Sequence, residues 1–177
     1  IKLEDIPEIF EKLENNGLST QQACGDSWRN IVGNPMAGKA PEFVDAWPVI
    51  QELNERFKGN DDHSNLPRKW KVSVTGAPDG SGQGDINDLA LEPAYKEIDG
   101  EEVRGFNIAV GGGLSRNEPR IARQLNVFVR PDEAADVAGG ISALFREHGD
   151  RENRYNARIK FLMDEWGPEK MRRVLQE

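Results

Sequence analysis

Hydrophobic positions along the chain recur at two different spacings, and each spacing predicts one kind of secondary structure. Residues 4–15 and 48–58 carry apolar side chains at helical intervals, so both segments are predicted to be helices. The apolar positions are Ile6, Ile9, Phe10 and Leu13 in the first segment, and Val49, Ile50, Leu53 and Phe57 in the second. Residues 18–39 lie between them without a clear period, and we expect an irregular segment there, of a length that is usually functional.

Strand-like alternation begins in the middle of the chain, where apolar and polar residues exchange places at every step. Residues 69–74 alternate as a half-buried strand, and further strands are predicted at 88–98, 104–110 and 124–129. Residues 76–85, between the first two of these strands, are rich in Gly, Pro and Asp, which is typical of a loop. This part of the chain is therefore predicted to form a sheet.

Helical spacing returns in the carboxyl-terminal part. A helix is predicted to begin at Pro131 and to end at Gly149, with acidic residues in its first turn that suit the helix dipole. A second helix over residues 151–166 is expected to bury Tyr155, and Gly167–Pro168 begins a last short helix. The whole pattern predicts an α+β fold, in which a mixed or antiparallel sheet has helices packed on it.

Composition narrows the classes of site that the chain can hold. Its single cysteine, Cys24, cannot close an internal disulfide or supply the four thiolates of an iron–sulfur cluster or a structural zinc site. The two histidines add little as metal ligands, so we expect no metal site made by this chain alone. The 177 residues suffice for one compact domain, and we expect residues 1–177 to form a single one.

Net charge and hydropathy argue against nucleic-acid-binding, membrane-spanning and secreted proteins. A net charge of −8 argues against nucleic-acid binding, which needs a basic face to neutralise phosphates. No stretch is long and apolar enough for a membrane span, and none resembles a signal peptide, so we expect a cytoplasmic protein with no membrane partner. The chain begins with Ile1 rather than Met, which we interpret as a piece of a longer protein.

A pair of lysines is the strongest local indication of chemistry. Residues two apart in a strand share a face, so Lys69 and Lys71 are expected to point together, while Trp70 points to the other side. Two neighbouring ammonium groups repel each other unless an anion neutralises them. The pair therefore indicates a site for an anionic substrate or a polycarboxylate cofactor. A solvated strand edge protected by lysines is the alternative that the local pattern leaves open.

Arg29 is a second candidate, within the segment predicted to be irregular. Its planar guanidinium suits carboxylates and oxyanions, and an ion pair with Asp26 is the structural alternative. A third candidate is the run Gly111–Gly113, where the lack of side chains permits close approach of a flat or phosphorylated ligand. The spacing fits no phosphate-binding glycine motif, and a plain turn is the alternative.

Three arginines at helical spacing form the weakest candidate. Arg151, Arg154 and Arg158 would share one face of the helix predicted over residues 151–166. The face is interpreted either as an anion-binding stripe or, more commonly, as a solvated surface.

Several of these segments together resemble one family, the sirohaem-dependent nitrite and sulfite reductases. The motifs appear in the family's order from Gly17 to Gly167, in the runs Gly17–Gln22, Asp26–Gly38, Ser64–Lys71, Asn107–Leu114 and Arg154–Leu162. The resemblance is to the sirohaem-facing domain in the amino-terminal half of such enzymes. It implies two similar halves, each with a ferredoxin-like part, and residues 124–177 are a candidate for the start of such a part.

The resemblance also implies an activity and the groups that support it. Enzymes of this family pass six electrons to nitrite or sulfite, giving ammonia or sulfide, through sirohaem and a [4Fe–4S] cluster. An assimilatory role, an electron donor such as ferredoxin, and the carboxyl-terminal half of the same protein are the implied partners. Nitrite or sulfite is the implied substrate.

Residue roles follow from the family's motifs. Residues at the places of Arg29, Lys69 and Lys71 face the distal side of the haem iron, where they bind the anion and assist proton delivery. Residues implied to lie around the macrocycle are Gln22, Asn30, Asn34, Arg68, Gly111, Gly112 and Gly113. Lysine at position 71 favours sulfite, whereas the run Gly33–Gly38 looks more like nitrite reductases.

Two features of the family are missing from these 177 residues. The cluster cysteines belong to the carboxyl-terminal half, and a further substrate-side arginine lies upstream of the residues present here. We therefore expect the chain to be inactive by itself. The alternative is a non-catalytic tetrapyrrole-binding or structural module that lacks the cluster, although it need not retain the three cations that this chain has.

Overall fold

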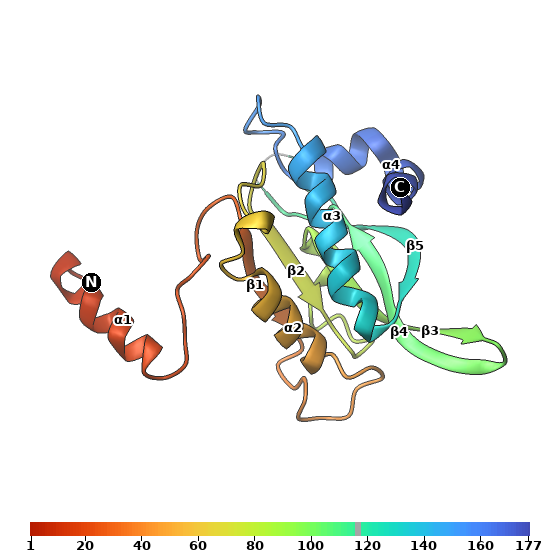
Figure 1. Ribbon diagram of the computed structural model, residues 1–177, viewed down its shortest axis with the longest axis horizontal. Coiled ribbons are helices and arrows are strands. Elements are labelled where there is room, and N and C mark those ends of the chain that lie inside the picture. The colour runs from red at the N-terminus through yellow and green to blue at the C-terminus, as the bar shows by residue number, and fades with distance from the viewer. Residues whose placement is uncertain (116–117) are drawn as a thin grey trace.

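A five-stranded sheet is the centre of the structure, a computed structural model that describes residues 1–115 and 118–177 (Figure 1). The strands lie across the sheet in chain order: β1 (Trp28–Gly33), β2 (Trp70–Val74), β3 (Leu89–Ile98), β4 (Glu101–Val110) and β5 (Arg123–Val129). The first three strands are parallel, whereas β4 is antiparallel to β3 and β5 is antiparallel to β4. The predicted mixed sheet is confirmed.

Helices cover one face of this sheet. α2 (Trp47–Phe57) and α3 (Ala134–His148) lie across the strands, and α4 (Ile159–Gln176) packs beside α3 and against β5 (Figure 1). α1 (Ile6–Glu14) forms where the spacing predicted it, but it has no buried residue and lies apart from the sheet. The predicted α+β class is confirmed, with the helices segregated to one side.

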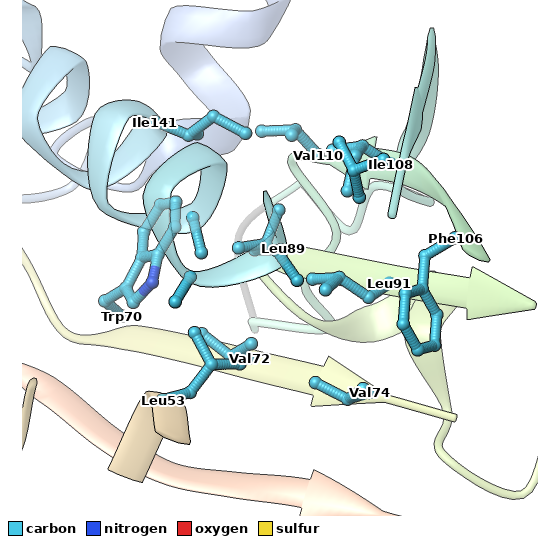
Figure 2. Close-up of a cluster of buried hydrophobic side chains, with 14 of the residues drawn as sticks. Leu53, Trp70, Val72, Val74, Leu89, Leu91, Phe106, Ile108, Val110 and Ile141 are labelled. Atoms are coloured by element: carbon cyan, nitrogen blue, oxygen red, sulfur yellow. The ribbon is translucent and has the colours of Figure 1, made fainter. Parts of the chain in front are cut away.

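The apolar core fills the space between the sheet and these helices. Alternate residues of neighbouring strands point into it, together with helix side chains, as Figure 2 shows for Leu53, Trp70, Val72, Val74, Leu89, Leu91, Phe106, Ile108, Val110 and Ile141. The ring of Trp28 stacks on Phe57 with 4.0 Å between centroids, and its indole N–H donates to Ser142 Oγ at 2.8 Å. These contacts hold β1 against both α2 and α3.

The loop after β2 covers part of the opposite face. Ser73 Oγ donates to the carbonyl of Gly82 at 2.6 Å, and the N–H of Ala122 donates to the carbonyl of Asp85 at 2.8 Å. The loop therefore lies over the middle of the sheet. Lys69 and Lys71, at the amino-terminal end of β2, remain half-buried.

β1 is an element that the expectation of an irregular segment over residues 18–39 missed. Trp28 pairs with Trp70 and Ile31 pairs with Val72, and the register shifts between these two pairs. This irregularity breaks the period of two within the short strand, so no alternation is visible in the sequence. Burial of the strand comes from pairing with β2, which is distant in the chain.

The predicted helix over residues 151–166 is wrong in its first half, because α4 begins only at Ile159. The side chain of Asp150 accepts hydrogen bonds from the N–H groups of Glu152 and Asn153, and Asn153 Oδ1 accepts from the N–H of Tyr155. Such local bonds compete with helix formation. Tyr155 is consequently 77% exposed rather than buried.

The end of α4 agrees with the sequence. Gly167 has a φ of 69°, which interrupts the helix, and Pro168 follows it at the beginning of the last helical segment. The predicted start of a last short helix at Gly167–Pro168 is confirmed. Because residues 151–156 are not helical, Arg151, Arg154 and Arg158 do not form the arginine face that their spacing suggested.

Candidate functional site

Strand alternation gives β2 two chemically different faces. Trp70 is fully buried in the core, so Lys69 and Lys71, its neighbours in the chain, belong to the opposite face, as the sequence predicted. Lys71 Nζ donates to the carbonyl of Ile86 at 3.4 Å. Arg68, just before the strand, has a guanidinium nitrogen 3.8 Å from the carboxylate of Asp26.

The charge around Lys71 is unbalanced. Burial lowers the pKa of the Lys71 ammonium below its usual value. The carboxylate of Asp88 opposes this, whereas the positive charges of Arg158 and Lys69 lower that pKa further. Three cations and one carboxylate therefore make up this cluster, which we name the cationic face: Lys69, Lys71, Arg158 and Asp88. An anion placed there would relieve the repulsion.

Asp88 and Arg158 are the parts of this cluster that the sequence reasoning missed. Asp88 Oδ1 accepts from Arg158 Nε at 2.9 Å and from a terminal guanidinium nitrogen at 2.6 Å. Both side chains are almost inaccessible, at 1% and 8% exposed. The one signal in the sequence was an aspartate directly before the apolar residues of a predicted strand. The spacing of Arg158 predicts a place on a helical arginine face, either an anion-binding stripe or a solvated surface, and the structure shows neither.

Arg29 lies on β1 beside this cluster. Trp28 pairs with Trp70, so Arg29 and Lys71 each follow one member of this pair on adjacent strands. The Arg29 guanidinium donates to the carbonyl of Ala23 at 2.6 Å and twice to that of Gly25, at 3.2 and 2.7 Å. Two of its five N–H donors take no part in these bonds.

The alternative ion pair between Arg29 and Asp26 does not account for Arg29. Asp26 instead accepts from both terminal nitrogens of Arg154, at 2.9 and 3.2 Å. Arg154 is thus part of a surface ion pair.

The amide side chains predicted around the macrocycle are spread over the β1 side of the molecule. Gln22 Nε2 donates to the carbonyl of Phe57 at 3.1 Å, and Asn34 Oδ1 accepts from the N–H of Met36 at 2.8 Å. Asn30 lines a cavity of about 350 Å³ with Trp47 and other residues of α2. This cavity lies on the helix side of the sheet, so the structure does not bring Asn30 next to Lys71.

The three glycines after β4 pack against the cationic face. The N–H of Gly111 donates to the carbonyl of Asp88, and that of Gly112 to the carbonyl of Asn87, both at 2.9 Å. A Cβ on Gly112 would lie 2.3 Å from the carbonyl oxygen of Asp85, and one on Gly113 would lie 3.2 Å from the guanidinium of Arg158. The chain itself therefore fills the space that the missing side chains leave. Their predicted contact with a macrocycle stays a prediction.

The geometry can be compared with known proteins. A family model described as the nitrite and sulphite reductase 4Fe-4S domain matches residues 24–177. The chain belongs to this family. The resemblance seen in the sequence motifs is thereby confirmed.

Individual members of the reductase family are similar over nearly the whole chain. The assimilatory ferredoxin-dependent nitrite reductase of Haloferax mediterranei is 47% identical over 178 residues, which is 99% of this chain and 30% of that protein. The sulfite reductase (ferredoxin) 1 of Mycolicibacterium paratuberculosis is 42% identical over 100% of this chain and 31% of that protein. The chain thus spans about 30% of the length of these relatives.

A solved structure supports the same assignment. The Mycobacterium tuberculosis NirA protein matches with a TM-score of 0.89 and 36% identity, over 99% of this chain and 31% of that one. The fold of the chain is therefore that of this reductase-family protein.

The chain's own residues do not fit the 4Fe–4S cluster that the family description names. Cys24 is its single thiol and is exposed, and the described residues contain no group of three or more His, Cys, Asp or Glu side chains arranged for a metal. Within the same part of the chain, no helix has both the length and the apolar character needed to cross a membrane.

Proposed function

We propose that this chain is the substrate-side and sirohaem-side domain of a six-electron nitrite or sulfite reductase. The observation that carries the proposal is the cationic face: in a chain with a net charge of −8, Lys71 is surrounded by the cations Lys69 and Arg158 and by a single carboxylate, Asp88. Nitrite and sulfite are both anions, and the names of the similar proteins include reductases of each. A local surplus of positive charge in a half-buried place is suited to either.

Sirohaem fits the cations near the amino-terminal ends of β1 and β2. Its many carboxylates need cationic partners, and Arg68, Lys69 and Arg29 with its two remaining N–H donors would hold them. When bound, sirohaem supplies the iron at which the anion is reduced. The cluster would be held by the remainder of the longer protein, in the carboxyl-terminal half, and a donor such as ferredoxin would supply electrons.

The lysines have two tasks in this proposal. Their ammonium groups bind the negative charge of the substrate, and they hold protons at Nζ for the oxygen atoms that leave as water. Burial and the neighbouring cations lower the pKa of Lys71, so it releases a proton more readily than an exposed lysine does. The planar guanidinium of Arg29 serves in binding.

Residues 1–177 act as one domain in this proposal. β5, α3 and α4, which residues 124–177 contribute, belong to the same sheet and core as β1 to β4. The assimilatory role and the cytoplasmic location stay predictions.

Kinetics on the full-length parent protein test the function. Lys71→Ala is expected to lower turnover by about 10²–10³-fold with nitrite and sulfite, because one preorganised donor is lost where negative charge develops. Lys96→Ala removes an exposed lysine from β3 and is the matched control, with wild-type turnover expected. Wild-type turnover of both Lys69→Ala and Lys71→Ala would instead mean that the face is a solvated sheet edge.

The non-catalytic alternative is distinguished by the rest of the parent sequence. Cys24 is the single cysteine of this chain, so the chain lacks a set of cluster ligands under either function. Four cysteines in two close pairs elsewhere in the parent, with reductase activity, are expected for the enzyme. Their absence, with retained tetrapyrrole binding, would establish the binding module.

A further inference from the structure

Asp88 is a buried junction between four parts of the fold. Its own N–H donates to the carbonyl of Lys71 at 3.0 Å, and its carbonyl accepts from the N–H of Gly111 at 2.9 Å. Its side chain adds two links, because Oδ2 accepts from the N–H of Lys71 at 2.9 Å and Oδ1 accepts twice from Arg158. β2, β3, the segment after β4 and the segment before α4 therefore meet at one residue, and the carboxylate itself joins Lys71 to Arg158.

Stability alone does not explain a charged pair at this depth. Removing a carboxylate and a guanidinium from water costs several kcal/mol each, and their attraction repays this only with good geometry. Apolar residues of similar volume often serve stability equally well. The pair is therefore best understood through what it fixes, and what Asp88 holds directly is the backbone of Lys71.

We propose that Asp88 is a positioning residue for the cationic face: clamped by Arg158, its carboxylate fixes Lys71 in the strand and balances the positive charge around the Lys71 ammonium. The inference rests on the proposed function of that face and deepens it. Asp88 itself is buried and does not meet the substrate.

Charge balance is the second half of this role. The charged groups that act on Lys71 are Asp88 from directly before β3, Arg158 from before α4 and Lys69 from directly before its own strand. Asp88 is the one negative charge among them. Burial raises the pKa of the Asp88 carboxyl, Arg158, the N–H of Lys71 and the Lys71 ammonium act in the opposite direction, and the two charge-assisted bonds from Arg158 favour the ionised form.

An exposed ion pair provides a matched control. Asp136 on α3 accepts from Arg56 on α2 at 2.6 Å, the same distance as the shorter Asp88–Arg158 bond, but its side chain is 72% exposed. Asp136→Asn therefore removes an aspartate–arginine pair of equal length from a place remote from Lys71. Any effect of losing an ion pair in general would appear in both variants.

The first experiment is an NMR titration of the Lys71 side chain in the 177-residue chain, assigned through Lys71→Arg. Asp88→Asn is expected to lower the titration midpoint of Lys71 by about one pH unit or more, since an opposite charge nearby shifts a pKa by ~1–3 units. Asp136→Asn is expected to leave it unchanged. An unchanged midpoint in a folded Asp88→Asn variant would overturn the charge-balancing role, whatever the activity of the parent.

The second experiment keeps the proposal testable if Asp88→Asn does not fold. Asp88→Leu/Arg158→Met replaces both members of the pair by apolar side chains, so neither is left buried without the other, and the fold is expected to persist. In the full-length parent its turnover is expected to fall by about 10²-fold, the effect of misplacing a catalytic group by about 1 Å. Lys71→Ala is measured beside it.

These two variants distinguish the two proposals. If Lys71→Ala lowers turnover but the double variant keeps wild-type turnover, the positioning role is overturned and the proposed function stands. Wild-type turnover in Lys71→Ala would overturn the proposed function, and the positioning role in catalysis with it. A slow double variant whose melting temperature equals that of the wild type would support both.

Discussion

The two faces of β2 differ in almost every physical property, although the strand is only five residues long. Trp70, Val72 and Val74 are fully buried among apolar side chains under the helices. Lys71, one position away, is half-buried beside charged groups and a loop. A step of one residue therefore separates positions that stabilise the fold from positions that bind an anion in the proposed function. Substitutions on the core face should lower stability, and substitutions on the other face should change the kinetics with the anion.

The largest effect is expected on the core face, from Trp70→Ala. Trp70 is completely buried and its ring stacks on Phe145 with 5.6 Å between centroids. Truncation should lower the free energy of unfolding by about 3–5 kcal/mol, as for other buried aromatic residues. Urea denaturation of the 177-residue chain measures this. A loss below about 1 kcal/mol would mean that the core face is not what stabilises the sheet.

A smaller effect, on the anion rather than the fold, is expected from Lys71→Asn in the full-length parent. Sulfite carries up to two negative charges near neutral pH and nitrite carries one, so the specificity constant for sulfite should fall more. A ratio change of about tenfold is expected, since unit charges about 4 Å apart interact by ~1–4 kcal/mol in this range of dielectric. Steady-state kinetics with both anions, one donor and fixed salt measure it. Equal proportional losses would show that Lys71 supplies general charge and no discrimination.

The stability of the fold should depend on pH between about 5 and 7 because of His63, which lies on the helix side of the sheet. Burial, then Arg146 and Arg56, lower the pKa of His63 below its usual 6.5, and its buried Nδ1 has no hydrogen-bond partner among the described residues. Below pH 6.5 the unfolded chain therefore binds the proton more readily than the folded one. Stability should fall as the pH drops from 7 through this range, and His63→Gln should flatten that slope. Denaturation midpoints at several pH values test it, and an identical slope in the variant would exclude His63 as the cause.

The smallest effect is expected from the exposed pair that Arg154 makes with Asp26. Arg154 is 63% exposed, and exposed ion pairs contribute about 0–1 kcal/mol. Arg154→Gln should therefore change the free energy of unfolding by less than about 1 kcal/mol, and less still at high salt. If Arg154→Gln lowered the free energy of unfolding as much as Trp70→Ala, the exposed charged residues would contribute to stability as much as the core does.

Local patterns were sufficient for the central strands and for the long helices. Residues 69–74 alternate cleanly because β2 has one apolar and one polar face, and the apolar stripe of α3 follows the helical period. The same alternation correctly paired Lys69 with Lys71. β1 was missed because its burial comes from pairing with a distant strand across an irregular register.

The missed parts of the candidate site share a physical cause. Asp88 and Arg158 are 70 positions apart in the chain, and the sequence around either residue does not predict contact with the other. Arg158 was misassigned because the helix was extended over residues 151–158, where the side chains of Asp150 and Asn153 bind the backbone instead. The packing of Gly112 against Asp85 is equally non-local. Sequence periodicity indicates which face a residue occupies, and it says little about which distant residue meets it.

The parallel pairing of β1 with β2 has a consequence for how the chain folds. The β3–β4 hairpin joins neighbouring residues and closes a short loop, so it can form early. β1 pairs with β2 only after the long connection through α2 has closed. The contact between Arg158 and Asp88 closes a still longer loop, of 70 residues. We therefore expect Arg29, Lys71 and Arg158 to come together in the last cooperative step. Partly folded chains would have a net negative charge and no place for an anion.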